Sequence, residues 1–157
     1  MNGPPIAGGL ALLLIVWLIS LNSRLISLKY NRESAFLEID EHLRRRHDLI
    51  PQLMSAVKGY LDHESNVLTK VIEARSRCLQ ATGISEKIAA EANLSAAMNG
   101  FNMQIEAYPE LKANSSFMHL QQEIGDIENK LAAVRRFFNS ATKEYNNGIG
   151  QFPSNIR

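Results

Sequence analysis

Histidine and carboxylate side chains are the first candidates for chemistry in this sequence, because such groups bind metal ions and transfer protons. The chain has 4 histidines and 16 acidic residues. A carboxylate-bridged metal pair inside a helical bundle needs Glu-x-x-His on each of two helices. The residues three positions before the histidines are not ligands: Ile39, Arg44, Tyr60 and Ser116. We therefore predict no metal and no other cofactor.

Other reactive groupings are incomplete. His63-Glu64 resembles the start of the zinc-protease motif His-Glu-x-x-His, but Val67 occupies the position of the second histidine. The serines have neither a Gly-rich nucleophile elbow nor a phosphate-binding loop around them. Cys78 is the only cysteine, and we interpret it as a small, inert, apolar residue of a helix. The sequence thus predicts a protein that is not an enzyme.

Two surface features remain. His119 and Glu123 are four residues apart and are interpreted as an exposed pair on one helix face. The densest charged run is Arg44-Arg45-Arg46, which could contact acidic lipid headgroups or the acidic face of a partner. Four acidic residues flank this run: Glu38, Asp40, Glu41 and Asp48. We favour a solvated, self-neutralised helix face, and the formal net charge of +1 argues against a nucleic-acid partner.

The stretch from Ile6 to Leu28 determines where these groups are placed. No charged residue occurs between Ile6 and Leu21, and a helix of that length spans roughly 24 Å. Extending it to Leu28 reaches the ~30 Å of a bilayer core if Arg24 directs its charge to the headgroups. We predict a tail and a single transmembrane anchor at residues 1–28, followed by one domain at residues 29–157.

Charge asymmetry predicts the orientation of this anchor. No Lys or Arg precedes the apolar stretch, whereas Arg24, Lys29 and Arg32 follow it. Basic residues stay on the cytoplasmic side, so we expect the short N-terminus outside and the domain in the cytoplasm, with the three basic residues at the membrane interface. The tail also lacks the basic region and cleavage site of a signal peptide, so we expect an uncleaved anchor.

Apolar residues recur at helical spacing after the anchor, and no alternating strand pattern occurs. Pro51 interrupts the first apolar stripe and removes a hydrogen bond to the carbonyl of His47. We favour a helix break between His47 and Pro51, with Asp48 capping a second helix, over one kinked helix. The second helix should end near 81–83.

A third helix should begin after Ser85 and stop before Pro109, with a turn from Pro109 to Ala113. Asn114 or Ser115 should cap a last helix that runs to about Gly148. The last helix has the most regular apolar stripe: Phe117, Leu120, Ile124, Ile127, Leu131, Val134, Phe138, Ala141 and Tyr145. We predict an all-α protein, with the transmembrane helix followed by an antiparallel up-and-down helical bundle.

The last helix contains more large apolar groups than one stripe needs. Phe137 lies beside Phe138, and Tyr145 and Phe152 follow. These side chains either cover the end of the bundle or form an exposed patch that binds a second copy of the chain. We favour self-association, and leave the intramolecular alternative open.

Several blocks of the sequence, in this order, resemble the LemA family. They are Arg45-Arg46-His47-Asp48-Leu49-Ile50-Pro51-Gln52-Leu53, Val57-Lys58-Gly59-Tyr60, Glu73-Ala74-Arg75, Tyr108-Pro109-Glu110-Leu111-Lys112-Ala113-Asn114 and Arg135-Arg136-Phe137-Phe138-Asn139. The resemblance covers about residues 30–155. It implies a bacterial membrane protein with one N-terminal anchor and a helical bundle, and it implies no particular activity. Some relatives have a lipid-accepting cysteine at the anchor and many have a longer C-terminal tail; we expect neither feature here.

Two hypotheses follow. The first is a non-enzymatic scaffold at the bacterial inner membrane that contacts lipid and binds itself or other membrane proteins. The alternative is a membrane-associated enzyme, or a lipid- or ligand-binding bundle, that uses polar groups near Asp48, His63 and Glu64. A tightly packed core would favour the scaffold, whereas a cavity lined by those three side chains would favour the alternative.

Overall fold

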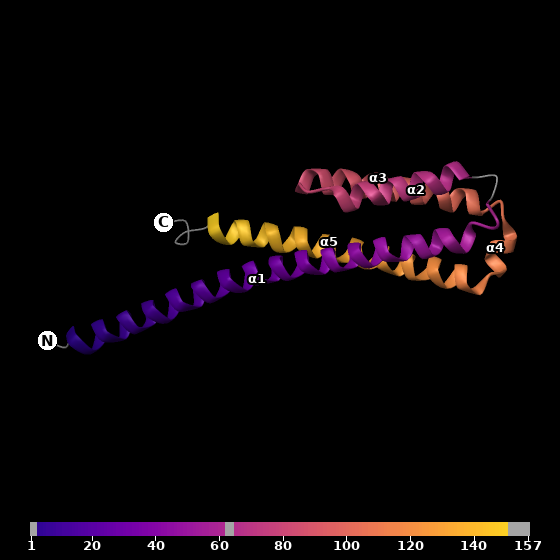
Figure 1. Ribbon diagram of the computed structural model, residues 1–157. Helices are drawn as coiled ribbons and strands as arrows, with labels where there is room; N and C mark the ends of the chain where they lie inside the picture. The colour runs from indigo at the N-terminus through magenta and orange to yellow at the C-terminus, as the bar shows by residue number, and fades with distance from the viewer. Residues whose placement is uncertain (1–2, 62–64, 151–157) are drawn as a thin grey trace. The chain divides into compact units, whose positions relative to one another are not determined.

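The computed structural model describes residues 3–61 and 65–150, and these residues form helices and short connections without a strand (Figure 1). The helices are α1 (Gly3–Val57), α2 (Ser65–Gln80), α3 (Ile84–Ile105), α4 (Pro109–Ala113) and α5 (Ser115–Gly150). The predicted all-α class, with a long apolar helix at the N-terminus, is confirmed.

The chain divides into two compact units. The first consists of residues 1–41 and 131–157, and the second of residues 42–130. Both α1 and α5 therefore contribute residues to each unit. The predicted boundary between an anchor and a bundle at residue 28 stays a prediction.

In the first unit, α1 and α5 run antiparallel. Three contacts define the register of the two helices. From one contact to the next, the residue numbers increase in α1 and decrease in α5. A Cβ atom on Gly148 would lie 3.1 Å from Leu25 Cδ2 and 3.3 Å from Leu28 Cδ1. The Arg32 guanidinium lies 4.5 Å from the centroid of the Tyr145 ring. The ring centroids of Phe36 and Phe138 are 6.3 Å apart, a separation typical of an aromatic pair.

The N-terminal part of α1 is long and apolar enough to cross a membrane. Every residue from Gly8 to Ser20 is exposed, including Trp17. Because water would solvate such a surface poorly, these residues are compatible with a membrane anchor. A signal sequence near the N-terminus has the same properties.

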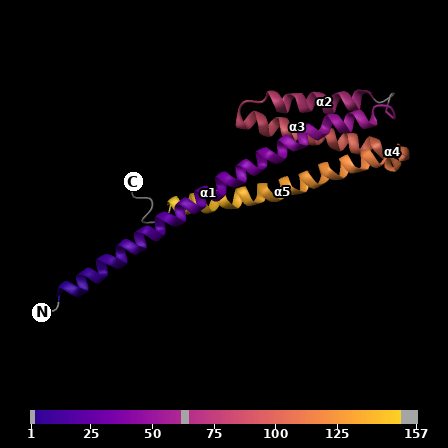
Figure 2. The same cartoon turned by 60° about the horizontal axis from the view of Figure 1, so that its bottom comes forward.

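The second unit has a buried apolar core. The α2 and α3 helices form an antiparallel hairpin that turns at residues 81–83, and both views show them side by side (Figure 2). The least exposed side chains come from the end of α1 and the turn after it, from α2 and α3, and from α4 and α5: Ile50, Leu53, Val57, Leu61, Val71, Leu94, Phe101, Leu111 and Phe117. The predicted stripe of α5 is confirmed, since its members are buried or half-buried from Phe117 to Tyr145.

The predicted helix break between His47 and Pro51 is wrong, because α1 continues through Pro51 to Val57. Proline cannot donate to the carbonyl oxygen of His47. Arg75 of α2 donates to that oxygen instead, with an Nε–O distance of 2.6 Å. Ile50 and Leu53 on either side are fully buried, so the packing and the replacement hydrogen bond both favour an uninterrupted helix.

The sequence also predicted that the second helix, capped by Asp48, runs without interruption to residues 81–83. This prediction is wrong as well. The α1 helix ends in a turn, where the amides of Tyr60 and Leu61 both donate to the carbonyl of Val57. The α2 helix begins at Ser65 and ends at Gln80, immediately before the predicted stop. The sequence signal for the extra turn is Gly59, a poor helix former.

The connection between α3 and α5 contains one more helix than expected. Residues 109–113 form the short α4 instead of a turn, and Pro109 is its first residue, where a missing N–H has no intrahelical acceptor. The predicted cap of α5 is confirmed: Asn114 Oδ1 accepts a hydrogen bond from the Phe117 amide at 3.1 Å.

Candidate functional site

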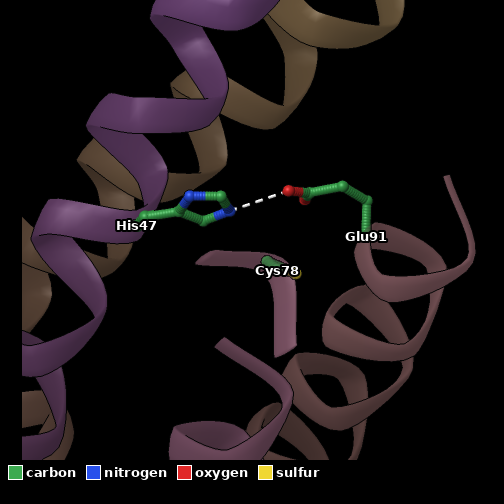
Figure 3. Close-up of side chains that lie close together, drawn as sticks. All are labelled: His47, Cys78 and Glu91. Atoms are coloured by element: carbon green, nitrogen blue, oxygen red, sulfur yellow. Dashed lines mark hydrogen bonds and ion pairs between the residues drawn. The ribbon is translucent and has the colours of Figure 1, made fainter. Parts of the chain in front are cut away.

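The strongest candidate site is a buried cluster of three side chains, one from each of three helices of the second unit. His47 comes from α1, Cys78 from α2 and Glu91 from α3 (Figure 3). All three are buried, and their potential ligand atoms lie within 4.8 Å of one another. We call these residues the His–Cys–Glu cluster.

His47 and Glu91 make the central contact of the cluster. The distance between His47 Nε2 and Glu91 Oε1 is 2.8 Å, as marked in Figure 3. An ionised carboxylate can only accept hydrogen bonds, so Nε2 is the nitrogen that carries the proton in this contact. The hydrogen bond from Arg75 to the His47 carbonyl holds the backbone of the same residue.

Arg46 supplies the positive charge beside the cluster and is only 2% exposed. Its Nη2 donates to the second carboxylate oxygen of Glu91. Its Nη1 lies 3.3 Å from Ser95 Oγ and 3.6 Å from Glu128 Oε1. Its Nε is buried and has no hydrogen-bond partner among residues 3–61 and 65–150. The guanidinium is thus paired with carboxylates but not fully satisfied.

The surroundings set the protonation states of the acid and the thiol. Burial would raise the pKa of Glu91, but the hydrogen bond from His47 and the charge of Arg46 together hold it below its ordinary value. Glu91 is therefore ionised at neutral pH. Burial first, and then the negative charge of Glu91, raise the pKa of the Cys78 thiol to about 11, so this group is a neutral thiol at the same pH.

This arrangement can do two things chemically. The Arg46–Glu91 ion pair and the His47–Glu91 hydrogen bond connect α1 to α3, and the Arg75 hydrogen bond connects α1 to α2. These bonds fix how the three helices pack. Imidazole, thiolate and carboxylate are also the three side-chain classes that bind zinc and related cations. A neutral buried thiol is a poor nucleophile, so the geometry does not favour nucleophilic catalysis by Cys78.

The three predicted arginines do not form one exposed face, and that interpretation is wrong for Arg46, which is buried. Arg45 is exposed and pairs with Glu123 through Nη2–Oε1 and Nε–Oε1 distances of 2.5 and 3.2 Å. Arg44 is exposed as well. Successive residues of a helix point about 100° apart, so only one of the three reaches the core. The predicted pair of His119 and Glu123 is confirmed at 4.0 Å.

The other predicted site residues lie in the first unit. Arg24 and Lys29 are exposed, and Lys29 pairs with Glu33 at 3.8 Å. Arg32 is half-buried against Tyr145, as described above.

Among the predicted aromatic interaction residues, Phe138 and Tyr145 are half-buried within the unit. Phe137 is 51% exposed. Phe152 lies outside the described residues.

The ligand-binding alternative named Asp48, His63 and Glu64, and the described part of the chain shows no site formed by these three residues. Asp48 is exposed, and His63 and Glu64 lie outside the described residues. A groove of about 450 Å³ does exist in the second unit, but other residues line it: Ile50, Pro51, Met54, Ser55, Lys58, Leu68, Thr69, Ile72 and Arg75.

Sequence reasoning missed Glu91, although a signal was present. Glu91 is three residues before Leu94 in the stripe that continues with Met98, Phe101 and Ile105, and all of these residues are buried. An acid at a core position of a helix requires a partner. Ile88, three positions before Glu91, is exposed. The histidine and the cysteine could not be connected to Glu91 by spacing, because each lies on a different helix.

The sequence is similar to those of known proteins. The sequence model of the LemA family matches residues 35–157. The chain is also similar to Protein LemA of Metamycoplasma hominis, with 25% identity over 113 residues. That match covers 71% of this chain and 52% of the relative, so the chain spans about half of the relative's length.

Proposed function

Because the chain belongs to the LemA family, we propose that it is a non-enzymatic scaffold of the bacterial inner membrane that associates with itself and with other membrane proteins. In this proposal α1 crosses the bilayer once, the short N-terminus lies outside, and the rest of the chain lies in the cytoplasm. Three basic residues support the orientation, because Arg24, Lys29 and Arg32 all follow the apolar stretch.

The observation behind the proposal is the large apolar surface that the described residues leave exposed. In α1 the surface from Gly8 to Ser20 has no buried residue, and lipid is the environment that suits it. Further along the first unit, six large apolar or aromatic side chains are also exposed: Ile26, Tyr30, Phe36, Leu37, Phe137 and Ile149. Exposed apolar side chains on a protein surface commonly belong to an interface, which supports binding of a second copy in this unit.

The absence of a catalytic role is part of the proposal, and the chemistry of the buried cluster supports it. Arg46 beside the cluster forms an ion pair with Glu91, and the Cys78 thiol is protonated at neutral pH. No group in it is therefore poised as a nucleophile.

The mass of the full-length protein in detergent micelles tests self-association. Light scattering corrected for bound detergent should give a mass larger than one chain, and Phe137→Ser should shift it toward the monomer. Met103→Ser is the matched control, since Met103 is an exposed apolar residue of α3 in the other unit, at 73% exposure. A monomer at every concentration, unaffected by Phe137→Ser, would contradict the proposal.

A further inference from the structure

We propose that the His–Cys–Glu cluster is a binding site for a divalent transition-metal cation of borderline softness, with zinc as the best match. His47, Cys78 and Glu91 would be its three protein ligands, and a water molecule would complete a four-coordinate shell. This inference is independent of the scaffold role, because it concerns only the second unit.

The first argument is the convergence of ligand types. One imidazole nitrogen, one sulfur and one carboxylate oxygen, all buried, meet within 4.8 Å. Zinc binds nitrogen, oxygen and sulfur at about 2.0–2.3 Å, which places neighbouring ligand atoms about 3.3–3.6 Å apart in a tetrahedron. His47 Nε2 and Glu91 Oε1, now 2.8 Å apart, would separate by about 0.5 Å, and the distance from the sulfur to either atom would shorten by at most about 1.2 Å.

The second argument is the shell around these ligands. Metal-binding carboxylates are usually held by a second hydrogen bond from the protein, and Arg46 supplies one to the other oxygen of Glu91. The backbone of His47 is held by Arg75. The buried Nε of Arg46 still lacks a partner among the described residues, and such a donor normally hydrogen-bonds to an acceptor such as water.

The third argument is charge. The charged groups around these ligands are the carboxylates of Glu91 and Glu128 and the guanidinium groups of Arg46 and Arg75. A divalent cation that displaces the thiol proton of Cys78 and binds neutral His47 through Nε2 adds only one net positive charge to this group. The high thiol pKa does not oppose this step, because a coordinated thiol is deprotonated by the metal. The proton leaves to solvent, and the Nε2 proton of His47 moves to Nδ1.

Cobalt(II) is the probe, since a cobalt–thiolate bond gives a charge-transfer band in the near ultraviolet. The full-length protein in detergent is stripped with a chelator, kept reduced with a phosphine, and titrated with cobalt. We expect one equivalent bound with a charge-transfer band, and removal of the band by excess zinc. Cys78 is the only cysteine of the chain, so such a band can arise from this residue alone.

Two variants complete the experiment. Cys78→Ser should abolish the band and weaken cobalt binding by at least about 100-fold, since even changes outside the first shell of ligands cost about 10–100-fold. His119→Gln is the control, because it removes an exposed histidine that is paired with an acid. It should change neither the charge-transfer band nor the affinity for cobalt. If Cys78→Ser fails to fold by circular dichroism, the wild-type titration decides alone. A folded wild-type protein without a charge-transfer band at saturating cobalt would overturn the proposal and leave the cluster as a buried ion pair only.

Discussion

Arg75 donates a hydrogen bond from Nε to the carbonyl oxygen of His47 over 2.6 Å. This is the oxygen that an amide at position 51 would bind if Pro51 were another residue. A side chain of α2 thus satisfies the backbone of α1, and a proline remains inside a helix without a break.

We predict that Arg75→Met destabilises the protein by about 1–3 kcal/mol, because a buried carbonyl loses its donor. In a Pro51→Ala background the new amide supplies the missing hydrogen bond, so the same substitution should cost clearly less. Denaturant unfolding followed by circular dichroism measures this double-mutant cycle. Equal costs in both backgrounds would show that Arg75 does not substitute for the amide.

Asp48→Ala is the control for this cycle. If Asp48 capped a second helix, the substitution would cost about 1 kcal/mol. Because α1 is continuous and Asp48 is exposed, we expect a change within about 0.5 kcal/mol.

The second prediction concerns the buried ion pair. Glu91→Gln leaves the guanidinium of Arg46 buried beside a neutral amide, and should destabilise the protein by about 3–5 kcal/mol. Glu123→Gln removes the carboxylate from a pair whose arginine side chain is 63% exposed, and should cost less than about 1 kcal/mol. Comparable unfolding free energies for the two variants would contradict the assignment of Arg46 and Glu91 as the dominant pair.

The third prediction concerns the reactivity of the Cys78 thiol in protein from which a chelator has removed any bound metal. Burial and the nearby Glu91 raise the pKa of Cys78 from 9.0 to about 11, so its thiolate fraction at neutral pH is about 100-fold below that of the unfolded chain. Alkylation by iodoacetamide should be at least that much slower in the native state, and its rate should keep rising as the pH passes 9 and approaches 11. Rapid native labelling that levels off near pH 9 would disprove the shift.

The fourth prediction concerns topology. A reporter that fluoresces only in the cytoplasm, fused after Arg157, should be bright, because the basic residues follow the apolar stretch. The matched variant replaces Arg24, Lys29 and Arg32 with Gln and should lower the fraction of bright protein. An intact but dark wild-type fusion would reverse the proposed orientation.

Periodicity was sufficient to predict much of this fold. The buried face of α5 and its cap at Asn114 could be read from residue types, since both depend on local spacing. The effect of Pro51 could not be predicted in the same way, because a proline inside a helix removes a backbone hydrogen bond and usually breaks the helix. Arg75, which replaces that hydrogen bond, is 24 positions further along the sequence.

The candidate site depended on tertiary structure for the same reason. Arg46 and Arg45 are neighbours in the sequence, but one is buried and the other exposed. The His–Cys–Glu cluster takes one residue from each of three helices, so no short motif contains it. Only the acid at position 91, within an apolar stripe, indicated a buried polar group.

The contacts between α1 and α5 in the first unit also determine where the length of the chain can vary. Gly148 meets Leu25 and Leu28, and Arg32 meets Tyr145. One residue inserted between Leu28 and Arg32 would rotate every later side chain of α1 by about 100° relative to the earlier ones, so the two contacts could not form together. One residue inserted among the exposed positions before Leu25 would preserve the phase of both contacts and only lengthen the apolar segment by about 1.5 Å. In the proposed membrane arrangement, the apolar segment can therefore differ in length to match bilayers of different thickness, whereas the helix between Leu28 and Arg32 cannot.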